Sequence, residues 1–230
     1  MKFFLSLGLV LVFSANSHAS AAQKMNPIVL GVIDQKSRAD YESKLLPILQ
    51  KHLEACSYCE VRNLTPYNEA GDYNQAALPA QIEQASTSVQ ILFVNWNAKL
   101  NTESKALLPL FNQLSEKGVV LVVAAGAPKE GENSAPLHRT LFGQLPHAMI
   151  IGELGEHDRL WGTSYYGPEM LTALRPPKDL IGQGYSPMIF ATRLAMNMNK
   201  KSGTEWVDYI KTKKQKTKKI WLDLNDIFGR

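Results

Sequence analysis

The stretch "KGVVLVVAAGA", residues 117–127, decides the fold class. Gly118 stands where a helix usually ends, and an unbroken apolar run follows it. Runs of this kind are typical of strands in a parallel sheet that is covered on both faces. The sequence predicts further strands at 27–34, 60–64, 89–94 and 148–152, and helical periodicity separates them at 39–55, 73–86 and 102–117. We therefore expect one α/β domain, a three-layer sandwich with a mainly parallel β-sheet.

The first 21 residues have the layout of a secretory signal peptide. Lys2 precedes an apolar run at 3–13, and the small residues "ASA" at 19–21 end the segment. A run of about 11 apolar residues is well short of the roughly 20 that a membrane-spanning helix needs. We predict a signal peptide at 1–21 and a single domain at 22–230, exported to the periplasm or secreted, and not integral to the membrane.

Charge argues against a nucleic-acid partner and concentrates near the carboxyl end. The whole chain has 25 Lys and Arg against 21 Asp and Glu, which is close to balance. The run "KTKKQKTKK" at 211–219 either contacts an anionic envelope surface or is a solvated loop or helix end. Its lysines are Lys211, Lys213, Lys214, Lys216, Lys218 and Lys219. No metal, phosphate or nucleotide motif occurs, so we expect no cofactor and no metal.

The two cysteines, Cys56 and Cys59, follow a helical pattern and precede a strand. A redox pair of the thioredoxin kind would instead open a helix, where thiol pKa values fall. In an oxidising compartment we expect a structural disulfide between them.

Three strand ends bring candidate reactive groups together. Asp34 ends the first strand, Asn95 the third, and the turn 125–127 the fourth. In open parallel sheets the ligand-binding groups gather outside the carboxyl ends of the strands. We therefore expect a site at that edge.

Several stretches, in order along the chain, resemble segments of the subtilisin-like serine proteases. "GVIDQ" at 31–35 is similar to the strand that bears the catalytic aspartate, and "VVAAGAP" at 122–128 to the A-A-G-N turn. "LPHAMIIGEL" at 145–154 resembles the P-x-V-I-x-V-G-A strand, and "IGQGYSPMIFATRLA" at 181–195 the nucleophile motif G-T-S-M-A-x-P-H-V-A. "KIWLDLNDI" at 219–227 resembles the closing segment, which we expect to be a strand.

The resemblance implies roles for three positions. Asp34 falls on the catalytic acid and Ser186 on the nucleophile. Ala127 falls on the asparagine that donates to the oxyanion, and alanine has no side-chain donor. Losing that donor typically costs about 100- to 1,000-fold in rate. From the residues alone, Ser186 and Pro187 would be an ordinary helix cap and first-turn pair.

The family's histidine base has no counterpart. The H-G-T-H segment is missing, and only "QKSRAD" separates Asp34 from the first helix. His52 is predicted at the far end of that helix, about 18 Å along its axis from the site at 1.5 Å per residue. His138, His147 and His157 are expected in loops or at strand boundaries.

Two acids at the start of the first helix offer an alternative base. Related carboxyl-type proteases use a glutamate and an aspartate there, and Asp40 and Glu42 occupy that region. Acids in a first helical turn are, however, also favoured by the helix dipole.

Two functional hypotheses follow. In the first, the chain is a pseudoprotease that binds a peptide or a protein in its cleft, and Ser186 serves as a helix cap. In the second, it is a serine hydrolase with weakened or altered machinery that uses Ser186 and Asp34.

Overall fold

The computed structural model describes residues 26–127, 133–162, 164–180 and 184–229. The expected signal peptide, 1–21, lies outside the described residues. Within the described ranges, no helix combines the length and apolar character needed to cross a bilayer.

Six parallel strands form one sheet in the order β2-β1-β3-β4-β5-β6. The strands are β1 (Ile28–Ile33), β2 (Cys59–Asn63), β3 (Ile91–Val94), β4 (Val120–Ala124), β5 (Met149–Glu153) and β6 (Met170–Leu174). This confirms the expected three-layer α/β fold with a parallel sheet. The five predicted strands are present, and β6 is an additional strand at the edge.

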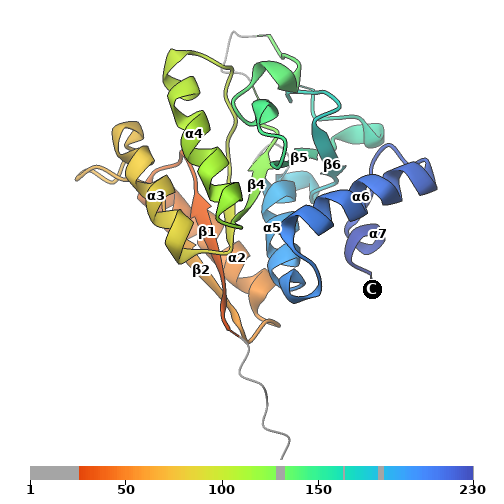
Figure 1. Cartoon of the computed structure of the whole chain (residues 1–230), viewed down its shortest axis with the longest axis horizontal. Coiled ribbons are helices and arrows are strands. Elements are labelled where there is room, and N and C mark those ends of the chain that lie inside the picture. The colour runs from red at the N-terminus through yellow and green to blue at the C-terminus, as the bar shows by residue number, and fades with distance from the viewer. Residues whose placement is uncertain (1–25, 128–132, 163, 181–183, 230) are drawn as a thin grey trace, which may run out of the picture.

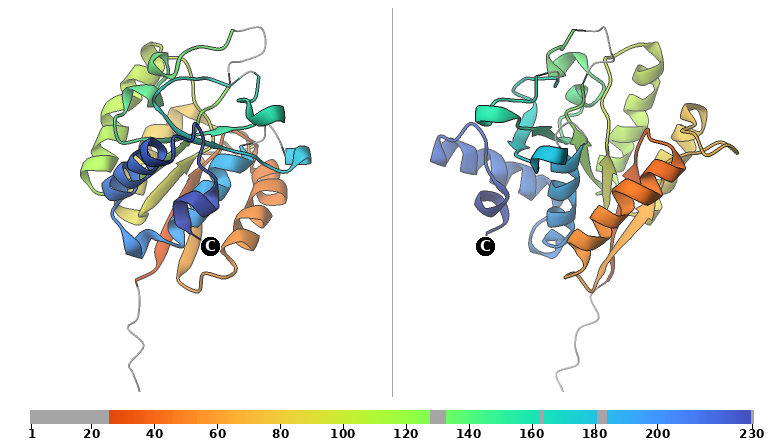
Figure 2. Two further views of the ribbon diagram at one scale, coloured as in Figure 1. Left: turned by 90° about the vertical axis from the view of Figure 1, so that its right-hand side faces the viewer. Right: turned by 180° about the vertical axis from the view of Figure 1, so that it is seen from behind.

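Helices cover both faces of the sheet (Figure 1; Figure 2). One face packs against α3 (Leu78–Ser88) and α4 (Thr102–Glu116). The other packs against α2 (Leu46–Leu53), α5 (Tyr185–Ala195), α6 (Gly203–Thr217) and α7 (Leu224–Phe228). Successive residues of a strand therefore face different cores: Leu92 belongs to the first and Phe93 to the second. Burial on both faces explains why the central strands β3 and β4 are continuously apolar.

The first helix accommodates Pro47 through a wider turn. Ser37 caps the short α1 (Arg38–Asp40), a π-helical stretch spans Tyr41–Leu45, and α2 begins at Leu46. Proline lacks the backbone N–H that a helix interior needs, and Pro47 stands in the first positions of α2. The predicted helix thus exists, but in three segments.

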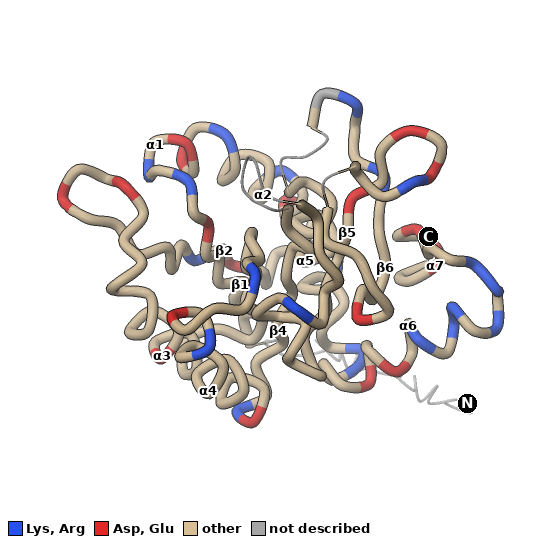
Figure 3. Tube along the Cα trace, turned by 90° about the horizontal axis from the view of Figure 1, so that it is seen from above, with Lys and Arg blue, Asp and Glu red and all other residues tan. Residues whose placement is uncertain are grey.

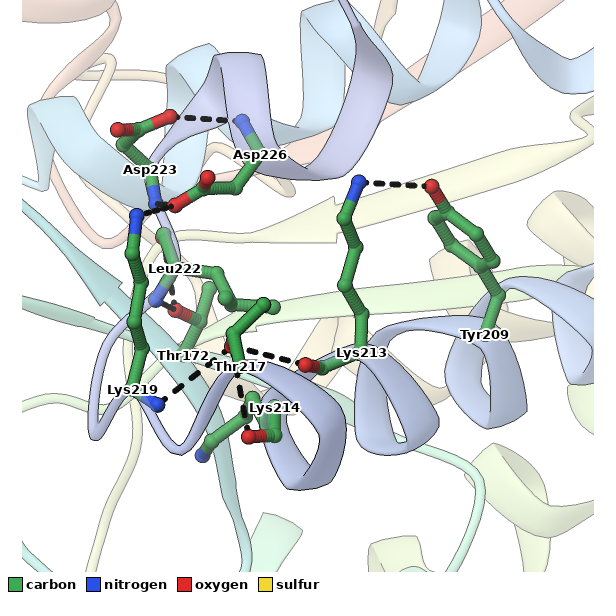
Figure 4. A network of polar contacts seen from close by, with 9 residues as sticks. All are labelled: Thr172, Tyr209, Lys213, Lys214, Thr217, Lys219, Leu222, Asp223 and Asp226. Atoms are coloured by element: carbon green, nitrogen blue, oxygen red, sulfur yellow. Dashed lines mark hydrogen bonds and ion pairs between the residues drawn. The ribbon is translucent and has the colours of Figure 1, made fainter.

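The prediction of a closing strand at 219–227 is wrong. The segment is irregular up to Asp223, whose side chain accepts a hydrogen bond from the N–H of Asp226 and so caps α7. The hydroxyl of Thr172 in β6 holds this segment: Oγ1 donates to Leu222 O and accepts from Leu222 N (Figure 4). Both residues are fully buried, so one hydroxyl satisfies two backbone groups.

We expect Thr172→Val to lower the free energy of unfolding by roughly 1 to 3 kcal/mol, because it leaves the N–H and C=O of Leu222 without their partner. Thr192→Val is the matched control. Thr192 is also fully buried, but its hydroxyl donates only to Ile189 O within its own helix. Urea unfolding of both variants measures the difference, and an equal loss in both would contradict the assignment.

Candidate functional site

A cleft of about 420 Å³ lies at the carboxyl ends of the strands. Its walls come from the residues after β1, β3 and β4, from β5, and from the start of α5. Its lining includes Asp34, Lys36, Asn95, Trp96, Ala127, Glu153, Trp161, Gly184 and Pro187. The edge of the sheet predicted to hold the site is thus hollowed.

Asp34 is buried at the end of β1, where its side chain is 2% exposed. Oδ2 accepts a hydrogen bond of 2.9 Å from Nδ2 of Asn95, and Oδ1 accepts one of 3.1 Å from the N–H of Lys36. The hydroxyl of Thr65 accepts from the N–H of Asp34. Asp34 therefore meets an amide, and not an imidazole, inside the cleft.

Ser186 is not the helix cap that the sequence suggested. Gly184, with φ of 76°, is the N-cap of α5, and Ser186 is the second residue of the helix. Its hydroxyl donates to Leu174 O at 2.9 Å, and the residue is 1% exposed. The oxygen that would attack a substrate instead ties α5 to the end of β6.

Glu153 is the last residue of β5 and was not among the predicted site residues. Its side chain lies at the N-terminal end of α5. Its Oε1 accepts a hydrogen bond of 3.0 Å from the N–H of Ser186. Glu153 is 8% exposed and lines the cleft. A carboxylate at a helix N-terminus is stabilised by the dipole and by the unpaired N–H groups there. Glu153 also stands where the P-x-V-I-x-V-G-A pattern has its final alanine. This replacement of an alanine by an acid is the feature of the sequence that could have drawn attention to Glu153.

Gly184 allows the close packing at the centre of the site. A side chain there would strike the amide of Asn95, and the positive φ already disfavours one. Ala127, the position of the missing oxyanion donor, is exposed and lines the cleft. The backbone N–H of Ser186 could also donate to an oxyanion, but it donates to Glu153 instead.

The described hydrogen bonds of the histidines do not reach Ser186. Nε2 of His52 lies 3.0 Å from the hydroxyl of Tyr185, so His52 comes closer to the start of α5 than its place in the sequence suggested. His138, His147 and His157 are exposed. The hydroxyl of Ser186 thus has a backbone carbonyl, and no ring nitrogen, as its described acceptor.

Asp40 and Glu42 are not among the residues that line the cleft. Asp40 pairs with Lys44, and its Oδ2 accepts a hydrogen bond from the hydroxyl of Ser37; both contacts lower the pKa of Asp40. The structure therefore favours the interpretation that these acids stabilise the first turn of the helix and do not act as a catalytic base.

Cys56 and Cys59 form a disulfide. The bridge joins the turn after α2 to the first residue of β2. Its place away from the cleft-lining residues agrees with the structural role expected from the sequence.

The lysine-rich segment forms the end of α6 and the turn after it. Figure 3 shows these basic residues at the periphery of the molecule. Three of the six lysines have hydrogen-bond partners within the chain. Lys213 donates to Tyr209 and Lys219 to Asp226 (Figure 4). Lys214 donates to Leu171 O. Burial lowers the pKa of Lys214. The other three lysines of the run are exposed and have no such contact among the described residues. They are Lys211, Lys216 and Lys218.

Comparison with solved structures identifies the architecture. A cold adapted subtilisin-like serine proteinase matches with a TM-score of 0.57 at 10% identity, over 80% of this chain and 81% of that one. The chain has a subtilisin-like fold. A lanthipeptide protease matches with a TM-score of 0.54 at 9% identity, over 82% and 79% of the two chains. A protease from Pseudoalteromonas arctica PAMC 21717 matches with a TM-score of 0.54 at 11% identity, over 89% and 87%.

The comparisons of sequence found no relative. No protein-family model and no curated protein matches the chain. The likeness to the subtilisin-like proteases is therefore one of fold.

We expect Asn95→Asp to destabilise the protein by about 3 to 4 kcal/mol at pH 7. It places a second carboxyl group against Asp34, and two adjacent buried carboxylates raise one pKa by several units. A raised carboxyl pKa in the folded state means that the loss shrinks as pH falls toward about 4. Urea unfolding at pH 7 and pH 5 measures this. Asn95→Ala, which adds no charge, is the control, and the same pH dependence in both variants would contradict the prediction.

A second prediction concerns His52. Partial burial lowers its pKa below the ordinary 6.5, and the charges of Arg193 and Lys51 lower it further. We expect the NMR titration of its ring to have a midpoint below 6.5. Because the unfolded state takes up this proton more readily, His52 favours folding above about pH 6.5, and that contribution is lost as pH falls. A midpoint at or above 6.5 would refute the burial of the ring against Tyr185.

Proposed function

We propose that the chain is a pseudoprotease, which keeps the cleft of its subtilisin-like fold to bind a peptide or a protein and does not use Ser186 as a nucleophile. The observation that supports this best is that both donors of Ser186 are committed internally. The hydroxyl donates to Leu174 O and the N–H to Glu153. A nucleophile must expose its oxygen to the substrate and pass its proton to a base.

Two features of the surroundings support the same proposal. Asp34 accepts from the amide of Asn95 and not from a histidine, so among the described residues no imidazole bonded to Asp34 can take the hydroxyl proton. Ala127 offers no side-chain donor to a tetrahedral intermediate, and the carboxyl group of Glu153 already accepts the N–H of Ser186 that could serve as such a donor.

The competing hypothesis is a serine hydrolase of altered mechanism. It is motivated by the retained acid and serine, since Asp34 lines the same cleft as Gly184 and Pro187, the two neighbours of the 185–186 pair. For this mechanism the hydroxyl would have to leave Leu174 O and find another base.

Export is part of the proposal. The layout of residues 1–21 supports it, and a disulfide between Cys56 and Cys59 suits an oxidising compartment. Contact with an anionic envelope surface would use Lys211, Lys216 and Lys218, the exposed lysines at the end of α6.

We expect the protein without its signal peptide to remain unlabelled by a fluorophosphonate probe under conditions that label an active subtilisin completely. It should also leave denatured casein intact. Gel fluorescence and mass spectrometry of the intact protein measure both. The Ser186→Ala variant is the matched control: labelling of the wild type that disappears in this variant would establish the hydrolase and overturn the pseudoprotease.

A further inference from the structure

The turn after α6 carries the most exposed large apolar side chain among the described residues. Ile220 is 73% exposed, against 48% for Tyr166 and 41% for Trp161. A single apolar residue at a surface is common and carries no conclusion by itself. Its neighbours along the chain are unusual, however, because residues 211–220 hold six lysines and no acid. We call Lys216, Lys218 and Ile220, at the end of this run, the basic tip.

The structure fixes the chain on both sides of Ile220. Just before it, the ammonium of Lys219 lies 2.7 Å from a carboxylate oxygen of Asp226 (Figure 4). Two residues after it, both the N–H and the carbonyl oxygen of Leu222 are bound by the hydroxyl of Thr172. Ile220 therefore stands in solvent between two held points, and its exposure is not that of a frayed chain end.

The backbone of Lys218 shapes the tip. Lys218 is the C-cap of α6 and has a φ of 55°, in the left-handed region. Glycine is the usual residue at a helix end of this kind, because a side chain is disfavoured there. Residues kept in such conformations are found preferentially at functional positions. A lysine in place of glycine retains a positive charge where the chain turns toward Ile220.

The acids of α6 lie at its opposite end. Glu205 belongs to the capping box with Ser202, and Asp208 follows it. Lys216 is eight residues beyond Asp208, about 12 Å along the axis at 1.5 Å per residue. The Debye length is about 8 Å at physiological ionic strength. Salt therefore largely screens these acids from the basic tip.

The acids of α7 are closer, but they do not neutralise the tip. Asp226 is paired with Lys219, and Asp223 accepts a hydrogen bond from the N–H of Asp226. Asp223 alone is thus left to oppose Lys216 and Lys218, which are exposed and have no printed contact among the described residues. The tip and the lysines before it therefore carry an excess of positive charge around one exposed apolar side chain.

The basic tip lies at the outer end of α6, away from the sheet (Figure 1; Figure 3). None of its three residues lines the candidate cleft. Lys211 is five residues before Lys216, which rotates it by about 140° around a helix of 3.6 residues per turn. A flat surface therefore meets the tip and not the whole lysine run, and Lys211 acts on it from a greater distance.

We propose that the basic tip binds a bilayer of anionic lipids, with Lys216 and Lys218 against the lipid phosphates and Ile220 inserted among the headgroups. This rests on the export and the envelope contact proposed above, and it adds the apolar group that enters the membrane. Basic residues draw a protein to an anionic leaflet, and a buried apolar side chain adds binding that salt does not screen. The tip combines both on a fixed turn.

The test measures binding of the protein without residues 1–21 to lipid vesicles by sedimentation. Vesicles of phosphatidylcholine alone are compared with vesicles that contain an equal part of phosphatidylglycerol. We expect binding to the anionic vesicles only. Binding should weaken as salt rises, because the attraction between lysine and phosphate is screened.

Variants assign the binding to the tip. We expect Ile220→Ser to weaken it by about five- to tenfold, because the inserted apolar area is lost. Ile220→Trp should strengthen it, since tryptophan favours the membrane interface. Lys216→Gln should weaken it by about fivefold. Lys105→Gln is the matched control: Lys105 is exposed on α4, which covers the other face of the sheet, and this variant should bind like the wild type.

Insertion is measured separately from binding. The two cysteines of the chain are joined in a disulfide, so a thiol introduced by Ile220→Cys can be labelled selectively with an environment-sensitive fluorophore. We expect its emission to shift to shorter wavelength with anionic vesicles, as the label leaves water. The same label on Lys105→Cys should show no shift.

The outcomes separate this inference from the proposed function. Binding that is equal in the wild type and in Ile220→Ser, without a shift of the label, would overturn insertion and leave an electrostatic envelope contact standing. No binding to anionic vesicles would overturn both. Self-association without lipid that Ile220→Ser abolishes would assign the tip to a second copy of the chain and overturn the proposal. The pseudoprotease proposal is tested independently, by labelling at Ser186.

Discussion

The hydrogen bond from the N–H of Ser186 to the carboxylate of Glu153 organises the site. It joins the end of β5 to the first turn of α5, and the hydroxyl of the same serine joins that turn to the end of β6. The start of α5 is thereby held against two neighbouring strands. The same two contacts stabilise the fold and withdraw from solvent the groups that acyl transfer would require.

Much of the fold was predictable because the sheet is covered on both faces. Such burial demands apolar residues at every position, and β3 and β4 accordingly appear in the sequence as continuous runs. β6 was missed because Thr172 interrupts its apolar pattern; that hydroxyl is tolerated only because Leu222, 50 residues away, pairs with it. The segment around Trp221 was expected to be a strand, yet it adds no strand to the described sheet, because Leu222 bonds to the side chain of Thr172 in β6 and not to the backbone of that strand.

The site was predictable in part, for a similar reason. Asp34 stood out as an acid directly after a buried strand. Glu153 fits the same rule, but the strand was predicted to end at Gly152, so the acid was not recognised as the last residue of a strand. The error over Ser186 concerned local backbone: a serine before proline is a common cap, whereas here the left-handed conformation of Gly184 begins the helix two residues earlier. Sequence spacing does not reveal which carbonyl a buried hydroxyl will find.

The order of the strands leaves β2 at one edge of the sheet, next to β1 only. Glu60 and Arg62 pair with each other on this short strand, and the disulfide fixes its first residue, Cys59. Charged side chains on an edge strand discourage another chain from adding to the sheet there. Addition of a further strand at β2 is accordingly disfavoured, whether it comes from a second copy of the chain or from the peptide of the proposed function, which would instead enter at the carboxyl ends of the strands.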